Sequence, residues 1–306
     1  MKRNAIIRIV IWSLVIVVLV TIMSSVMFGW TLRDRRFSSE STAETAVPME
    51  TLYAISYDGK DTFPASEISE LEIDWVAGEI LIQPGNSDQI TVREDNVNDD
   101  KYAMVLRQSG NELKITFCEE SLNNFIGFGS TNELSKDLTI TVPRDWLCET
   151  LDIECAAATL EVNDMTIREV DFDGASGACE FENCTVEEMD IDTASGDIRF
   201  IGSLEMLDCD AASASVFAVL TNTPSRLDID SMSGDLEIVL PQNAGFTLSM
   251  DTMSGDFQSD FETTMKNGNY VCGDGRCRIN VDALSGEVML RAAEEAAASA
   301  IENTIP

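Results

Sequence analysis

The chain has 306 residues, no histidine and a formal net charge of −34 at neutral pH. The absence of histidine excludes Ser-His-Asp and Cys-His nucleophile systems, and it excludes zinc sites built on imidazole. A surface this acidic repels nucleic acid and anionic lipid but attracts divalent cations and cationic peptides. We therefore expect no nucleic-acid partner.

The N-terminal region predicts a membrane anchor. Residues 1–8 form a short basic segment, and residues 9–32 carry no charged side chain. A helix of that length is roughly 36 Å long, which is enough to cross a hydrocarbon core of about 30 Å. Trp12 and Trp30 stand near its ends, as interfacial aromatic residues do. The segment is too long for the apolar part of a signal peptide, so we predict a retained transmembrane helix.

The next segment, residues 33–67, is largely polar and predicts a tether and lead-in to a domain. Basic residues on the two sides of the anchor nearly balance, so they do not decide its orientation. A large domain that follows a single N-terminal anchor favours passage of that domain to the outside. We expect a single-pass membrane protein with an extracytoplasmic domain.

Residues 68–291 contain a repeated frame of about 20 residues, which is typical of stacked supersecondary units. Alternating apolar residues on both sides of a small-residue arc predict two strands, each with one buried face. Glycines in the arc, such as Gly177 and Gly196, suit positive φ or close approach of the neighbouring coil's backbone. The eight copies begin at Leu71, Leu151, Val170, Met189, Leu207, Leu227, Leu248 and Ile279.

These features predict an all-β fold, a single-stranded β-helix (β-solenoid) whose coils stack about 4.8 Å apart with like residues in ladders. Further apolar residues, such as Ile167 and Val186, indicate a third side of each coil. Residues 83–150 interrupt the frame, and segments such as 102–117 and 138–143 predict an antiparallel strand insertion. The Ala/Glu-rich tail, residues 292–306, could cap the far end or be disordered, and we favour disorder.

The chain resembles the toastrack family, also called the "putative adhesin" family, of bacterial envelope-associated domains of unknown function. The resemblance rests on the opening coil DWVAGEILIQPG (74–85), the strand LTITVP (138–143) and the SGD or SGE arcs, and it covers roughly residues 68–291. It implies a β-helical domain, often beside a membrane segment and in a surface or envelope-stress context. It carries over no catalytic residues. The arcs AAAT (156–159) and ASAS (212–215) depart from the family pattern.

Acidic residues recur at two positions of the arc region. The fourth frame position is acidic in all eight copies, and the ninth adds further carboxylates. One interpretation is a ladder that holds calcium or another hard cation. The interpretation that we favour is structural, with each Asp accepting backbone N–H groups of its own arc in an Asx-type turn. The metal candidates are Asp192, Asp197, Asp230, Asp235, Asp251, Asp256, Asp282 and Glu287.

Eight cysteines in an exported domain would suggest disulfides, but not every one of them fits that role. Cys179 and Cys209 occupy inward frame positions, where a thiol acts as a small apolar filler. Cys272 and Cys277 in VCGDGRC form the one local pair that predicts a disulfide. A zinc site there lacks a second pair of ligands.

Three functions stay open. We favour a non-catalytic binding, adhesive or envelope-stress accessory role at the bacterial cell membrane, with envelope proteins, cationic peptides or surface ligands as partners. The alternative is a surface adhesion or structural module that depends on calcium or another divalent cation. A carbohydrate-active β-helix enzyme comes third, because paired carboxylates abound but no basic residue recurs in register. We expect no cofactor, with Ca²⁺ as the one exception that the acidic ladder permits.

Overall fold

The computed structural model describes residues 51–53, 59–97, 102–119 and 135–293. The predicted anchor, most of the tether and the tail beyond Ala293 lie outside the described residues. Within them, no helix is long and apolar enough to cross a membrane. The described chain is almost entirely β-structure, joined in a single 20-stranded sheet that wraps around one core. The predicted all-β class is therefore confirmed.

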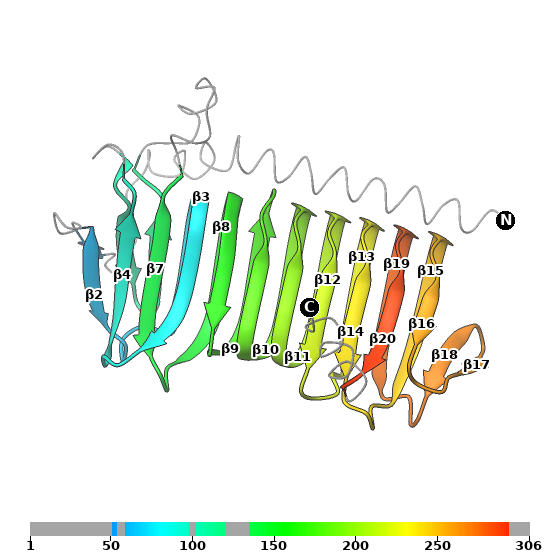
Figure 1. The fold of residues 1–306 in the computed structure, drawn as a ribbon. Coiled ribbons are helices and arrows are strands. Elements are labelled where there is room, and N and C mark those ends of the chain that lie inside the picture. Colours follow the sequence, from blue (N-terminus) through cyan, green and yellow to red (C-terminus); the bar gives the residue numbers. More distant parts are fainter. Residues whose placement is uncertain (1–50, 54–58, 98–101, 120–134, 294–306) are drawn as a thin grey trace, which may run out of the picture.

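The coils stack side by side in a row, as Figure 1 shows. The first half of each repeat lies on one side of the core, which we call face A, and the second half lies on the opposite side, face B. Four long strands run through both faces: β3 (Glu70–Gly85), β8 (Leu147–Asn163), β10 (Cys179–Ser195) and β11 (Ile198–Ser213).

The other strands belong to one face each. Face A also contains β1 (Thr51–Tyr53), β5 (Val105–Ser109), β6 (Glu112–Thr116), β9 (Thr166–Gly174), β13 (Arg226–Ser233), β15 (Phe246–Ser254), β17 (Thr264–Lys266), β18 (Asn269–Cys272) and β19 (Cys277–Ser285). Face B also contains β2 (Lys60–Pro64), β4 (Gln89–Asp95), β7 (Asp137–Pro143), β12 (Val216–Leu220), β14 (Leu236–Leu240), β16 (Phe257–Ser259) and β20 (Val288–Ala292).

Stacking is parallel and in register, so equivalent residues form ladders. Ile153, Phe172, Ile191, Cys209 and Ile229 follow one another on adjacent strands, and each is at most 3% exposed. The predicted third side is also present. There, Ile167 pairs in register with Val186, and both side chains are buried in the core.

The glycine arcs bring neighbouring backbones into direct contact. Gly196 has φ +140°, and a Cβ atom built on it would lie 1.7 Å from the carbonyl oxygen of Gly177. Gly177 stands in the same relation to Ala158, at 1.9 Å. Both reasons expected for glycine, a positive φ and a close approach of the next coil, therefore apply at the same residue.

The last two coils are not stacked in sequence order. β19 pairs with β13 on one side and with β15 on the other, so the final coil lies between two earlier ones (Figure 1). The hairpin β17–β18 explains this order, because β18 pairs antiparallel with the outer edge of β15. The chain then returns to the inner edge of β15, and the open sheet edge is covered by the hairpin.

The interruption at residues 83–150 extends the stack at its other end. β5 and β6 form an antiparallel hairpin, and β4 pairs antiparallel with β7, as the sequence predicts. β6 and β7 also pair parallel with the two halves of β3, and together they add one split coil.

A buried ion pair stabilises this end. Lys136 Nζ donates to Glu94 Oε2 at 2.6 Å and to the carbonyls of Tyr102 and Phe117 at 2.6 and 2.5 Å. Both charged side chains are 2% exposed. Burial lowers the pKa of Lys136, and the Glu94 carboxylate opposes that shift. Trp75 also donates its indole N–H to the Lys136 carbonyl at 3.0 Å. Lys136 therefore stabilises the first arc through both its ammonium group and its backbone carbonyl.

Candidate functional site

The outer surface of face A carries two parallel columns of carboxylates, which we call the acidic ladder. The columns arise because frame positions two and four are separated by two residues, and such residues point to the same side of a strand. The second-position column contains Glu72, Asp152, Asp171, Asp190, Asp208 and Asp228, and the fourth-position column contains Asp74, Glu154, Asp173, Asp192, Asp210, Asp230, Asp282 and Asp251.

Basic side chains neutralise the ladder at two places. Lys114 on β6 contacts Glu72, and its Nζ lies 2.8 Å from Asp74 Oδ2. Burial lowers the pKa of Lys114, but the two carboxylates outweigh it and raise the pKa above the ordinary value. Farther along, Arg226 lies 3.3 Å from both Asp208 and Asp228.

The central part of the ladder has no such partner. Three adjacent strands, β8, β9 and β10, supply its carboxylates, and none forms an ion pair with a basic residue of the described chain. These carboxylates are Asp152, Glu154, Asp171, Asp173, Asp190 and Asp192. They lie about 4.8 Å apart between strands, a distance at which like charges repel substantially near a protein surface.

The pKa values record this crowding. Burial, followed by repulsion from Asp171 and Glu72, raises the pKa of Asp152 to about 7. Burial and repulsion from Asp210 and Asp173 raise the pKa of Asp192 to about 7 as well. Burial and repulsion from neighbouring carboxylates also raise the pKa of Glu154, Asp173 and Asp190, and Lys114 offsets only part of the shift at Glu154. Binding of a proton or another cation therefore stabilises the centre of the ladder, because it reduces the negative charge there.

The favoured hydrogen-bonding interpretation of the fourth-position residues is wrong. No backbone N–H of the described chain donates to these carboxylates, and the pKa shifts of Asp192 and Asp282 have only burial and charge repulsion as causes. Backbone bonding occurs at the ninth position instead, where Asp235 Oδ1 accepts the N–H of Glu287 at 2.9 Å. Sequence periodicity located these residues but could not show which position faces the arc.

The ninth-position carboxylates form a separate, shorter row on the arc side. In stacking order they are Asp197, then Asp235, Glu287 and Asp256, because the final coil is inserted between its neighbours. Asp197, Asp235 and Asp256 are exposed. Ser215 interrupts the row after Asp197.

The metal candidates are thus divided between the ladder (Asp192, Asp230, Asp251, Asp282) and the arc row. Burial and repulsion from Asp210 and Asp282 raise the pKa of Asp230 to about 6. Within the described ranges, no group of three or more cysteine, aspartate or glutamate side chains is arranged to hold a metal ion.

The second-position column is a part of the candidate site that the sequence alone did not reveal. Only the fourth and ninth frame positions were considered as sites, yet Asp152, Asp171 and Asp190 at the second position double the charge of the ladder. The recurrence of acids at both positions was the available signal. It needed the parallel register to show that the two columns are adjacent.

The two cysteines of VCGDGRC lie on opposite sides of one strand. Phe246 of β15 pairs in register with Cys272 on β18 and with Cys277 on β19. Two strand spacings separate the thiols by roughly 10 Å between backbones, which exceeds the range that a disulfide spans. Both are free thiols in the structure, as are the buried Cys179 and Cys209. Burial raises the pKa of Cys277 to about 12, which leaves it unreactive.

The family model described as Toastrack DUF4097 matches residues 68–291. The chain belongs to the toastrack family. This membership agrees with the stacked parallel coils and with the glycine arcs, and it confirms the resemblance drawn from the sequence. No curated protein matches the chain.

Three solved structures are similar over most of this toastrack chain. A "putative adhesin" from Bacteroides fragilis is 11% identical, with TM-score 0.43, over 79% of this chain and 98% of that one. A "putative cell adhesion protein" from Clostridium sporogenes is 11% identical, with TM-score 0.33, over 80% and 99% of the two chains. A "putative lipid binding protein" from Parabacteroides distasonis is 13% identical, with TM-score 0.35, over 80% and 97%. Similarity at this level carries no argument about ligands.

Proposed function

We propose that this toastrack protein is a non-catalytic binding module that presents the acidic ladder to a cationic partner. The carrying observation is the central run of carboxylates on β8, β9 and β10, which lacks basic partners among the described residues. Raised pKa values at Asp152 and Asp192 support the proposal, since a bound cation relieves the repulsion that causes them. The partner of matching chemistry is a peptide segment rich in lysine or arginine.

The shape of the site suits an extended partner. The columns run across the strands on a flat, rigid sheet face, so the charges repeat at a fixed spacing of about 4.8 Å. A cationic segment that lies along this direction can contact several carboxylates at once without ordering the receptor. Preorganised sites of this kind lose little conformational entropy on binding.

The proposal also places the protein at the bacterial cell membrane. Residues 9–32 anchor it in a single pass, and residues 33–67 tether the toastrack domain on the extracytoplasmic side. The uncharged segment flanked by Trp12 and Trp30 supports the anchor. Digestion of intact cells with an added protease tests the orientation, and full protection of the domain would reverse it.

A peptide titration tests the binding function. The full chain in zwitterionic lipid nanodiscs is titrated with a fluorescent deca-lysine peptide, and binding is followed by anisotropy. The double variant D171N/D190N removes two exposed central carboxylates, and we expect affinity to fall about five-fold, given that exposed charge pairs contribute up to about 1 kcal/mol.

The matched control is E180Q/E182Q, which removes two exposed carboxylates from face B. We expect it to change affinity less than two-fold. Equal losses in both double variants would mean that net charge alone attracts the peptide, and the ladder would then not be the site. Absence of binding by the unmodified chain at low salt would reject the function itself.

A further inference from the structure

The buried pair formed by Lys136 and Glu94 is shielded from water by aromatic rings. Lys136 Nζ lies 2.6 Å from Glu94 Oε2, and each side chain is 2% exposed. The rings of Trp75 and Phe117 lie against the nitrogen, with 4.7 and 4.3 Å from Nζ to their centroids. The two rings also contact each other edge to face, at 5.1 Å between centroids. An amine and a carboxyl group are therefore held in contact inside an apolar enclosure.

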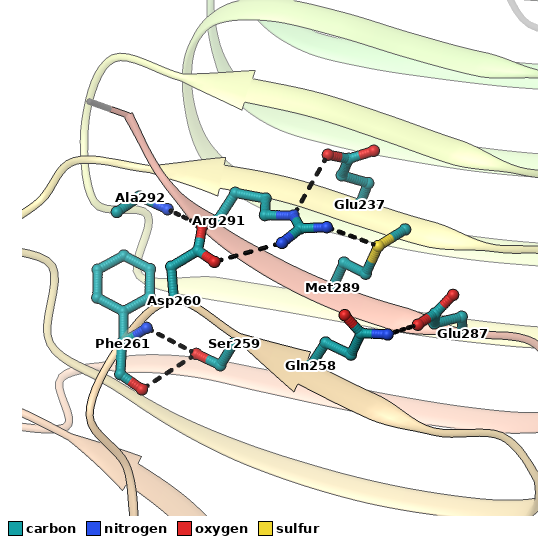
Figure 2. A network of polar contacts seen from close by, with 9 residues as sticks. All are labelled: Glu237, Gln258, Ser259, Asp260, Phe261, Glu287, Met289, Arg291 and Ala292. Carbon is teal, nitrogen blue, oxygen red and sulfur yellow. Dashed lines mark hydrogen bonds and ion pairs between the residues drawn. The ribbon is translucent and has the colours of Figure 1, made fainter. Parts of the chain in front are cut away.

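Two other ion pairs of the described chain lack this enclosure. Lys114 lies 2.8 Å from Asp74, but its side chain is 18% exposed, and burial lowers its pKa less than the neighbouring carboxylates raise it. Figure 2 shows Arg291 between Asp260 and Glu237, at 3.3 and 3.7 Å, with its side chain 34% exposed. A guanidinium group also stays protonated, so it does not act as a nucleophile. Neither pair combines a dry environment with an amine that loses its proton readily.

Lys136 has the properties of a nucleophile. Burial lowers its pKa, and the Glu94 carboxylate opposes that shift only in part. Because an apolar environment disfavours charged groups, a proton can pass from the ammonium to the carboxylate and leave a neutral amine beside a carboxylic acid. The carbonyl oxygens of Tyr102 and Phe117, at 2.6 and 2.5 Å from Nζ, hold the nitrogen at this position.

The backbone at Met104 prepares Glu94 for attack. The Met104 N–H donates to Oε1 and Oε2 of Glu94, at 3.1 and 2.9 Å. A nitrogen that is hydrogen-bonded to a carboxyl oxygen lies about 3–3.5 Å from the carboxyl carbon, which is the separation of a near-attack geometry. Rotation of the carboxyl group about its Cγ–Cδ bond then presents that carbon to the nitrogen. Attack places negative charge on a carboxyl oxygen, and the Met104 N–H stabilises it as an oxyanion-hole donor does.

We propose that Lys136 and Glu94 join in an intramolecular amide, an isopeptide bond that cross-links the start of the stack. Nζ forms a bond to Cδ of Glu94, and one C–O bond of the carboxyl group breaks. Two of the three ammonium protons leave with that oxygen as one molecule of water, and the third stays on the amide nitrogen. The reaction needs no oxidant, reductant or co-reactant. The inference is independent of the proposed function.

The bond constrains the end of the domain that follows the predicted tether. It joins β4 to the residue that precedes β7, and its two ends are 42 residues apart in the sequence. The β5–β6 hairpin lies within the closed loop. A cross-link over this length restricts the unfolded chain and so favours the folded state, as a disulfide does. The eight cysteines are free thiols in the structure, so the amide supplies a covalent constraint that they do not.

Mass spectrometry of the denatured full chain tests the bond. We expect the intact mass to lie about 18 Da, one water molecule, below that of the same chain without the bond. Trypsin does not cleave after an acylated lysine, so it should release residues 94–101 and 115–144 as one branched peptide. Fragmentation of that peptide should locate the bond at Lys136 and Glu94. A mixture in which the branched fraction increases during incubation would also support the inference.

Two lysine variants provide the controls. Lys136→Arg keeps the positive charge but removes the amine, so it should abolish the deficit and release residues 94–101 as a separate peptide. Lys114→Arg alters the more exposed ion pair and should keep the deficit. An unshifted mass with separate peptides in the unmodified chain would overturn the inference, whether or not Lys136→Arg folds. A deficit that persists in Lys136→Arg would assign the water loss to another site and would overturn it as well.

Discussion

Replacing Gly196 by alanine tests whether adjacent arcs are in backbone contact. A Cβ atom at this residue would lie 1.7 Å from the Gly177 carbonyl oxygen, whereas real Cβ atoms essentially never approach closer than 3.0 Å. The two coils would therefore have to separate by at least about 1.3 Å at the arc. The backbone hydrogen bonds between neighbouring strands on both faces fix the strand spacing near 4.8 Å, and they oppose that movement.

The expected loss combines two costs. Alanine at φ +140° adopts a backbone region that is nearly confined to glycine, at about 1–3 kcal/mol. Separation of these two coils weakens the bonds between them, such as Cys179 N–H to Asp197 O, each worth about 1 kcal/mol. We expect G196A to lower the free energy of unfolding by about 3–5 kcal/mol, measured by urea denaturation of the full chain.

Gly110 provides the matched control. It also has positive φ, +65°, but a Cβ atom there would have no neighbour within 4 Å. G110A should therefore cost only the backbone term, about 1–2 kcal/mol. If G196A were no more destabilising than G110A, contact between arcs would not be the reason for the repeated glycine.

Three further predictions concern charge and thiols. Lys136→Met leaves the buried Glu94 carboxylate without its cation and should destabilise the chain by about 3–5 kcal/mol, while K136M/E94Q should recover part of that loss; a loss below 1 kcal/mol in urea denaturation would contradict this. Folded pKa values of about 7 at Asp152 and Asp192, raised from 3.8, make stability highest at low pH and reduce it as pH rises through 7. The urea midpoint should therefore be higher at pH 5.5 than at pH 8, and D152N/D192N should flatten this dependence; an unchanged slope would remove these residues as its source. Dithiothreitol should leave the melting temperature unchanged, because Cys272 and Cys277 are free, and an intact mass 2 Da below that of the reduced chain would show a bridge instead.

The repeated frame determined the fold of the coils. Strict alternation at residues such as Leu227 and Ile229 fixes which side of each strand is buried, and the recurring glycine fixes the arc. Both properties depend on local chemistry, so one sequence suffices to predict them. The family resemblance and the all-β class followed from the same pattern.

The order of the last coils could not be predicted in this way. Repeats with the same frame, such as those at Leu227, Leu248 and Ile279, are interchangeable as neighbours in a parallel stack. The choice among them depends on the hairpin β17–β18, which occupies the outer edge of β15. That pairing joins residues that are far apart in the sequence, such as Phe246 and Cys272, and it leaves no periodic signal.

The candidate site, like the fold, was determined partly by the sequence and partly by the tertiary structure. Sequence alone determined that carboxylates recur at fixed frame positions and that histidine-based chemistry is excluded. Only the tertiary structure decided that Asp152, Asp171 and Asp190 stand beside the fourth-position column, and that Lys114 and Arg226 neutralise the ladder elsewhere but not at its centre. The physical reason is distance: repulsion, pKa shifts and ion pairing depend on separations between strands, which the register sets and the order of residues along the chain does not contain.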